Sequence, residues 1–247
     1  MSRAALQRAF PVLVSAGVLL FLFGRMDLTA LADSLTWRVA AVLIPSFLIY
    51  GAATLLIEAV SLELLLKAPR GEFGLWIAAR LKSASYLVGI LNYALGAGAL
   101  AFLLRRHTRL SLGEAASLVL LISSSDLVVV LGLAGAGAAL VEASAPTVQA
   151  GVIAAAMLAF FGGLALLRAP GSLGPLDRIR SLAIFEGLRT VPLPRLGTLL
   201  VLRVCFACCF VAVCAASFYA FEVKPPMAEL VVGVLVVAVV AGVPIAV

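Results

Sequence analysis

The sequence contains few charged residues. Lys, Arg, Asp and Glu make up 12% of its 247 residues, whereas hydrophobic residues make up 64%. A typical soluble domain carries about 25% charged and about 45–50% apolar residues. This shortage of charge excludes an ordinary soluble fold, and it arises from long uncharged runs. The runs are Pro11–Gly24, Val39–Ile57, Ser83–Leu104, Ala115–Ser125, Leu127–Val141, Ala143–Leu167, Val204–Phe221 and Leu230–Val247.

Histidine is almost missing, and no catalytic motif is present. The one histidine, His107, lies between Arg106 and Thr108 in a basic loop, where a solvated loop residue is a simpler interpretation than a general base. The sequence contains no nucleophile elbow, phosphate-binding loop, zinc-protease motif or glycine-rich nucleotide loop. We therefore expect a protein that is not an enzyme, with no catalytic residue and no cofactor.

Cysteine occurs four times, always within one apolar run, at Cys205, Cys208, Cys209 and Cys214. The first two have the C-x-x-C spacing found in some metal and redox sites. No histidine or carboxylate lies in the same run, and small apolar cysteines ease the packing of helices. We interpret these cysteines as packing residues and predict no metal site.

Several uncharged runs approach or exceed the ~20 residues that a helix needs to cross the hydrocarbon core. Lipid offers no partners to backbone N–H and C=O groups, so such runs form helices. The predicted fold class is all-α: a polytopic helical membrane protein with about six spanning helices, in which residues 1–247 form a single integral membrane domain. The last run has no polar exit, so we expect the natural chain to continue beyond Val247. The expected spans are Phe10–Gly24, Val39–Leu66, Ala115–Leu133, Val148–Leu167, Gly197–Phe221 and a final helix from Met227.

The distribution of cations determines the expected topology. The net charge of +6 is better explained by cytoplasmic loops beside anionic lipid headgroups than by nucleic acid, so we expect no nucleic-acid partner. If Ser83–Leu104 crossed the membrane once, Arg105–Arg109 and Arg168–Arg195 would lie on the side opposite to Lys67–Lys82, against the positive-inside rule. If it entered and returned on one side, most of the 18 Lys and Arg residues would be cytoplasmic, together with the N-terminus.

Residues 83–104 are too few for two full crossings of ~20 residues each. We therefore predict a re-entrant hairpin near 83–104, with its tip at Asn92–Gly98. Gly96 and Gly98 supply the flexible backbone that a tip needs. Non-helical backbone at this depth is tolerated only where it is buried in protein or lines a water-filled cavity.

Charged side chains within the spans are candidates for function. A charge at the bilayer centre costs about 2.5–3.5 kcal/mol on insertion scales, so it usually faces a bundle interior or a cavity. Asp126 follows a run of three serines, and Glu58 and Glu63 lie near the inner end of their span. The candidates for a substrate pathway are Arg80, Lys82, Asn92, Tyr93, Asp126 and Arg203.

Two interpretations of these charges stay open. In the functional one, Arg80, Lys82 and Arg203 attract the phosphate of a lipid headgroup along a polar route. In the structural one, Asp126–Arg203 and Glu58–Lys82 are internal ion pairs that fix the register of the helices. Similarly, Asn92 and Tyr93 at the hairpin tip either contact substrate or cap backbone groups.

The order of the segments also resembles a known family. Hairpin residues Leu91–Gly98 are followed by Leu103–Arg106, then by a span bearing Asp126-Leu127, and finally by Val243-Pro244-Ile245. This order resembles the lysylphosphatidylglycerol synthase transmembrane-region family, a flippase-like module, over about Leu35 to the end of the chain. The tip here lacks the arginine and glutamate that the family's tip usually has. The resemblance implies translocation of a membrane lipid, such as an anionic or aminoacylated phospholipid, by a multi-pass protein of the bacterial cytoplasmic membrane.

Two other functions stay open. One is a non-transporting scaffold or accessory subunit for a lipid-modifying enzyme or glycosyltransferase, which a closed interior with fully paired charges would favour. The other is a membrane enzyme acting on a lipid phosphate, for which Glu58 and Glu63 are the best residues on offer. The protein partners to consider are a second copy of the chain and a membrane enzyme.

Overall fold

The computed structural model describes residues 21, 24, 33–70, 74–90, 93–140, 146–170, 174 and 176–242. Most of the predicted first span and Asn92 lie outside these residues. The described part of the chain is helical, with no strand, in agreement with the predicted all-α class.

Three long helices form the frame: α3 (Trp37–Arg70), α6 (Leu112–Leu140) and α10 (Leu193–Ala220). Within them, Trp37–Leu66, Leu112–Gly137 and the whole of α10 are long and apolar enough to cross a membrane. This finding supports a membrane protein. The total of about six spans stays a prediction.

Shorter helices complete the fold, and their positions agree with most of the expected segments. The predicted helices at Val148–Leu167 and from Met227 correspond to α7 and α11. The shorter elements are α4 (Leu75–Gly89), α5 (Tyr93–His107), α7 (Pro146–Arg168), α8 (Leu176–Arg180), η1 (Ala183–Phe185), α9 (Glu186–Thr190) and α11 (Met227–Gly242).

Local sequence explains where the long helices begin and end. At the start of α6, Ser111 and Glu114 form a reciprocal capping box, each side chain accepting the other's backbone N–H. After α10, Glu222 adopts φ 60° and Val223 N donates to Phe218 O at 2.9 Å, which is a Schellman ending.

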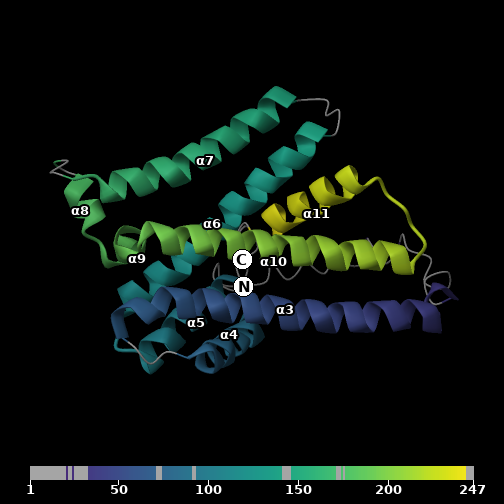
Figure 1. Ribbon diagram of the computed structural model, residues 1–247, viewed down its shortest axis with the longest axis horizontal. Coiled ribbons are helices and arrows are strands. Elements are labelled where there is room, and N and C mark those ends of the chain that lie inside the picture. Colours follow the sequence, from purple (N-terminus) through teal and green to yellow (C-terminus); the bar gives the residue numbers. More distant parts are fainter. Residues whose placement is uncertain are drawn as a thin grey trace, which may run out of the picture.

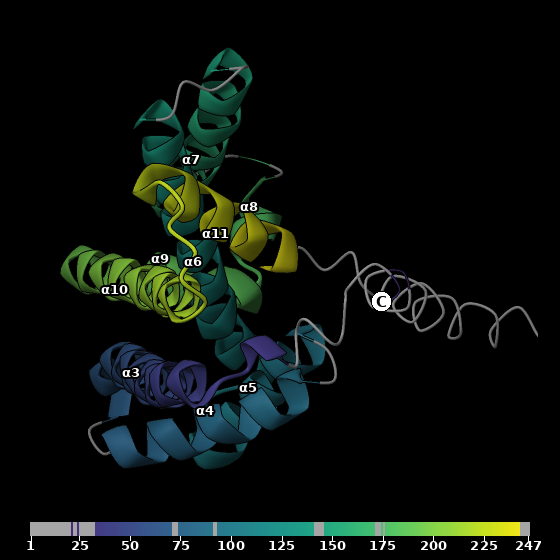
Figure 2. The ribbon, with the colours of Figure 1, turned by 90° about the vertical axis from the view of Figure 1, so that its right-hand side faces the viewer.

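Helices α3 and α10 run side by side in opposite directions (Figure 1). At one end of the pair, Arg38 Nη1 lies 2.6 Å from Glu222 Oε1. Helix α6 crosses this pair, and Figure 2 shows α4 and α5 beside α3 at the bottom of the view and α7 at the top, with α11 crossing α6 between them. The larger core cluster joins α3, the two short helices, α6 and the start of α10 through residues such as Leu62, Leu81, Leu104, Leu121 and Leu199.

The segment predicted to form the hairpin contains parts of two short helices rather than one straight span, and its entry into the membrane and return stay a prediction. Helices α4 and α5 have 15 residues each, about 22 Å at 1.5 Å per residue, so neither is long enough to cross the membrane. Helix α4 packs against α3, and both short helices share a core cluster with Ala59–Leu66, in the C-terminal part of α3. In Figure 1 the hairpin accordingly lies beside only part of α3.

The position predicted for the hairpin tip is wrong. Helix α4 ends at Gly89 and α5 begins at Tyr93, so Gly96 and Gly98 lie inside α5. Gly96 is buried, and a Cβ atom there would lie 2.7 Å from Gly89 Cα and 3.2 Å from Ser85 O. This glycine is therefore required for close approach of two helices, not for a flexible turn.

The outer surface is apolar, as expected of helices in lipid. In the most apolar window of α3 only 6% of the residues are buried within the described structure. Trp37 is 84% exposed and Ile49 is 69% exposed. A contiguous apolar face of this size on a protein in water would mark an interaction or aggregation surface, and a bilayer would cover it.

Candidate functional site

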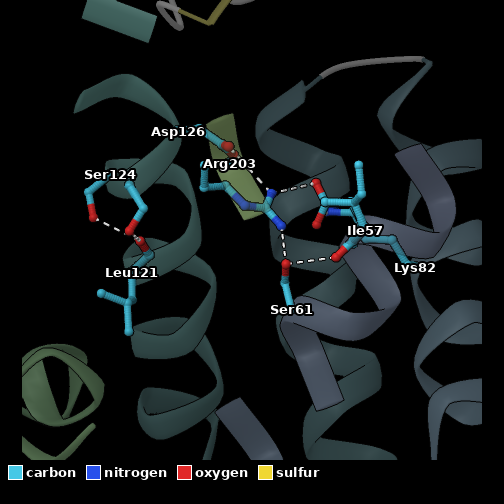
Figure 3. A network of polar contacts seen from close by, with 9 residues as sticks. Ile57, Ser61, Lys82, Leu121, Ser124, Asp126 and Arg203 are labelled. Atoms are coloured by element: carbon cyan, nitrogen blue, oxygen red, sulfur yellow. Dashed lines mark hydrogen bonds and ion pairs between the residues drawn. The ribbon is translucent and has the colours of Figure 1, made fainter. Parts of the chain in front are cut away.

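A buried cluster of charges joins the three long helices to the hairpin (Figure 3). Its centre is Arg203 of α10, which is 1% exposed. Arg203 Nη1 lies 3.1 Å from Glu58 Oε1 on α3 and 3.3 Å from Asp126 Oδ1 on α6. On α4, Lys82 Nζ lies 3.1 Å from Glu58 Oε2. Two carboxylates thus face two cations, and the cluster carries no net charge.

Hydroxyl groups complete the cluster. Ser61, one turn after Glu58 on α3, accepts a hydrogen bond from Arg203 Nη2 and donates its own proton to Ile57 O at 2.7 Å. Ser124 and Ser125 donate to Leu121 O at 3.1 and 2.7 Å, so they bond to their own helix. The serine run before Asp126 therefore gives no hydrogen bond to that carboxylate in the described contacts.

Access to the four charges is unequal. The side chains of Arg203 and Glu58 are 0% and 5% exposed, whereas those of Lys82 and Asp126 are 12% and 29% exposed. Arg203 Nε is buried and has no hydrogen-bond partner among the described residues. The cluster is thus closed around Arg203 and partly open at its two ends.

The structure brings together three of the six predicted pathway residues: Lys82, Asp126 and Arg203. Arg80 is exposed on α4. Residues two apart on a helix point in nearly opposite directions, so Arg80 and Lys82 cannot both face the cluster. Tyr93 begins α5, and Asn92 lies outside the described residues.

Glu58 is the residue that sequence reasoning undervalued. It contacts both cations, yet it was named among the charged groups of the spans and not among the six candidates for the substrate pathway. The available signal was a carboxylate far inside an apolar helix, three residues before Ser61. Both predicted pairs, Glu58–Lys82 and Asp126–Arg203, are present, and the Arg203–Glu58 contact links them into one network.

The four cysteines differ in their surroundings. Cys205 and Cys208 are exposed, so they do not pack against described helices, whereas Cys209 and Cys214 are half-buried. Within the described residues, no group of three or more His, Cys, Asp or Glu side chains could hold a metal ion.

Comparison with protein-family models, with curated proteins and with solved structures finds no match for this chain. The resemblance to the lysylphosphatidylglycerol synthase transmembrane-region family therefore stays an expectation from the order of the segments. The function has to be argued from the buried charges and from the helices that carry them.

Proposed function

We propose that this protein is a multi-pass protein of the bacterial cytoplasmic membrane that translocates a phospholipid or a related lipid. The observation that carries the proposal is the buried network of Lys82, Glu58, Arg203 and Asp126, built where a short helical hairpin meets three helices of membrane-spanning length. Ionisable groups inside a membrane domain are expensive and commonly mark a substrate or ion pathway.

The cluster can exchange partners without leaving a charge isolated. Glu58 is shared by two cations, and Arg203 has two carboxylates and Ser61 as acceptors. A lipid phosphate that reaches Lys82 would replace one carboxylate as its partner, while Glu58 keeps Arg203. Phosphate forms strong charge-assisted hydrogen bonds with such cations, so the exchange offers a polar resting point for a headgroup inside the hydrocarbon layer.

A second candidate is a non-transporting scaffold or accessory subunit for a lipid-modifying enzyme or glycosyltransferase. The observation that favours it is that all four charges of the cluster already have partners. Paired charges of this kind can serve only to fix the register of the helices. In that case a membrane enzyme or a second copy of the chain would be the partner.

Transport in proteoliposomes separates the two candidates. Vesicles containing the purified protein and a fluorescent phospholipid are treated with a membrane-impermeant quencher, and the rate at which inner-leaflet lipid becomes quenched is measured. We expect the wild-type protein to accelerate this rate above that of protein-free vesicles. A rate equal to that of protein-free vesicles, for zwitterionic and anionic phospholipids alike, would reject translocation and favour the scaffold.

A matched pair of double variants tests the role of the cluster. Glu58→Gln with Lys82→Gln removes one buried pair without changing net charge, and Arg38→Gln with Glu222→Gln does the same to an exposed pair. We expect the buried variant to slow transport at least about tenfold, which corresponds to the free energy of one charge-assisted hydrogen bond. The control variant should transport lipid at the wild-type rate. Equal transport by both folded variants would show that lipid does not use this route.

A further inference from the structure

A cavity of about 320 Å³ lies away from the charge cluster, where the end of α3, the start of α6, α9 and the start of α10 come together. This volume is at the lower end of the range of small-ligand sites, about 300–1,000 Å³. Its apolar lining contains Leu65, Leu66 and Leu118. Its polar lining includes Glu186 and Arg195.

The wall formed by α9 and the segment after it is held by specific contacts. Arg168 Nε donates to Leu188 O at 2.9 Å, and Arg168 Nη2 donates to Val191 O. Gly187 N donates to Ser117 Oγ at 2.6 Å, which ties α9 to α6. These contacts join segments that are distant in sequence, so tertiary contacts hold this wall of the cavity in place.

Arg195 lines this cavity and carries an unused donor. Its Nη1 atom is buried and has no hydrogen-bond partner among the described residues. A buried donor without a partner is destabilising, so such groups call for an explanation, and a ligand is one. The planar guanidinium group is well suited to phosphate, which it can bind through two parallel hydrogen bonds.

The charges around the cavity decide what kind of phosphate it would accept. Glu186 and Glu114 also line it, and Glu114 is already engaged in capping α6. A purely anionic headgroup would gain from Arg195 but be repelled by these carboxylates. A headgroup that carries both a phosphate and an ammonium group would satisfy both signs of charge.

We infer that this cavity binds a zwitterionic phospholipid headgroup, with its phosphate on Arg195 and its primary ammonium group on Glu186. The inference deepens the proposed function by naming the headgroup, and it rests on that function for the lipid source of the ligand. The same chemistry exists in free phosphoethanolamine. The apolar lining of Leu65, Leu66 and Leu118 favours the lipid form, because that lining would bury the atoms that join the headgroup to its chains.

Binding to the purified full-length chain in detergent tests this assignment. Three probes are titrated by calorimetry: short-chain phosphatidylethanolamine, phosphatidylglycerol with the same chains, and free phosphoethanolamine. We expect the first to bind at least about tenfold more tightly than each of the others, as expected for one charge-assisted hydrogen bond or for comparable apolar burial. Equal binding of the two lipids would overturn the zwitterionic assignment, and equal binding of free phosphoethanolamine would overturn the lipid source.

Two substitutions assign the residues. Arg195→Gln is expected to weaken phosphatidylethanolamine binding at least about tenfold. Glu186→Gln is expected to remove the preference for phosphatidylethanolamine over phosphatidylglycerol. Arg178→Gln, which neutralises an exposed arginine on α8, is the matched control and should bind as the wild type does. Retention of wild-type affinity by Arg195→Gln would contradict the inference.

Thermal unfolding without lipid tests whether Arg195→Gln weakens binding only because it destabilises the fold. Because Arg195 Nη1 has no partner to lose, Arg195→Gln should unfold no earlier than the wild type. A variant that unfolds early and binds weakly would show that Arg195 supports the fold, which overturns its role as a ligand contact. Binding with no transport in vesicles would reject the proposed function alone, whereas transport with no specific binding would reject this inference alone.

Discussion

The guanidinium group of Arg203 lies inside a bundle of apolar helices, where two carboxylates and a hydroxyl offset the loss of its hydration. The exposed pair Arg38–Glu222 is shorter, at 2.6 Å, but both of its side chains are 68% exposed. Exposed pairs contribute about 0–1 kcal/mol, whereas breaking a buried pair costs about 3–5 kcal/mol because the remaining charge has no partner. Burial, rather than distance, therefore sets the importance of each pair.

Replacement of Arg203 should destabilise the protein strongly. Arg203→Leu leaves Asp126 without an ion-pair partner in the described contacts, so we expect a loss of about 3–5 kcal/mol. Arg203→Lys retains the charge but not the fork of donors, so it should fall between the leucine variant and the wild type. Thermal unfolding in detergent measures the effect, with Arg38→Leu as the exposed control. Equal melting temperatures for Arg203→Leu and the wild type would contradict this account.

At the residue scale, the sequence predicts both ion pairs of the cluster but not the Arg203–Glu58 contact that links them. Asp126 and Arg203 stand out because each interrupts a long apolar run, and both belong to the cluster. Arg80 was grouped with Lys82 by closeness in sequence, but the helical turn directs the two side chains apart. Which of the two side chains faces the cluster depends on how α4 is rotated about its axis, and composition alone does not determine this rotation.

Among the helices, the hairpin α4–α5 contains one point of close contact between backbones. Gly96 on α5 approaches the backbone of Gly89 on α4, and no side chain separates the two helices there. Gly98, only two residues further along α5, is exposed, with nothing within 4 Å of a Cβ atom added to it. The two glycines therefore differ in role although they share one helix.

Alanine substitution should separate these roles. In Gly96→Ala the new methyl group would lie 2.7 Å from Gly89 Cα, so the helices must move apart, at a cost of about 1–3 kcal/mol. Gly98→Ala fills open space in a helix and should stabilise it by up to about 1 kcal/mol. Thermal unfolding compares the two variants directly. The same change in both would show that the close contact is unimportant.

The contact between α6 and α9 gives another prediction for the elements. Ser117→Ala removes the acceptor of Gly187 N and leaves a buried N–H group unsatisfied, which should cost about 1–3 kcal/mol. Ser124→Ala removes a bond to Leu121 O within α6 itself, so it should have little effect. If chemical unfolding shows equal stabilities for the two variants, α9 is not held through Ser117.

At the scale of the helices, the uncharged runs were sufficient to predict α3, α6, α7, α10 and α11. These runs are longer than most of the loops that connect them. The hairpin was predicted from the charges that flank it. Its turn was placed too late, because a glycine permits a turn and also permits close packing, and the sequence does not distinguish these uses. The cavity beside Arg195 could not be predicted, because it depends on how four separate helices meet.

At the scale of the whole molecule, the described residues are asymmetric in charge. The ends of α3, α5 and α7 and the starts of α4, α6 and α10 lie at one end, on the left in Figure 1. This end carries the basic segments Arg105–Arg109 and Arg168–Arg195. The opposite end of the α3–α10 pair carries Arg38, Glu222 and Lys224. Under the positive-inside rule, such a distribution predicts that the left-hand end faces the cytoplasm.

Labelling of single cysteines from each side of the membrane tests this arrangement most directly. The background is the chain with its four native cysteines replaced by alanine, and the probes are Arg38→Cys, His107→Cys and Lys224→Cys, all at exposed positions. Position 38 lies at the start of α3 and precedes the hairpin, whereas positions 107 and 224 follow the hairpin. If the hairpin enters the membrane and returns, position 107 is labelled from one side and positions 38 and 224 from the other. Labelling of positions 38 and 107 from the same side would contradict the hairpin and the membrane fold that depends on it.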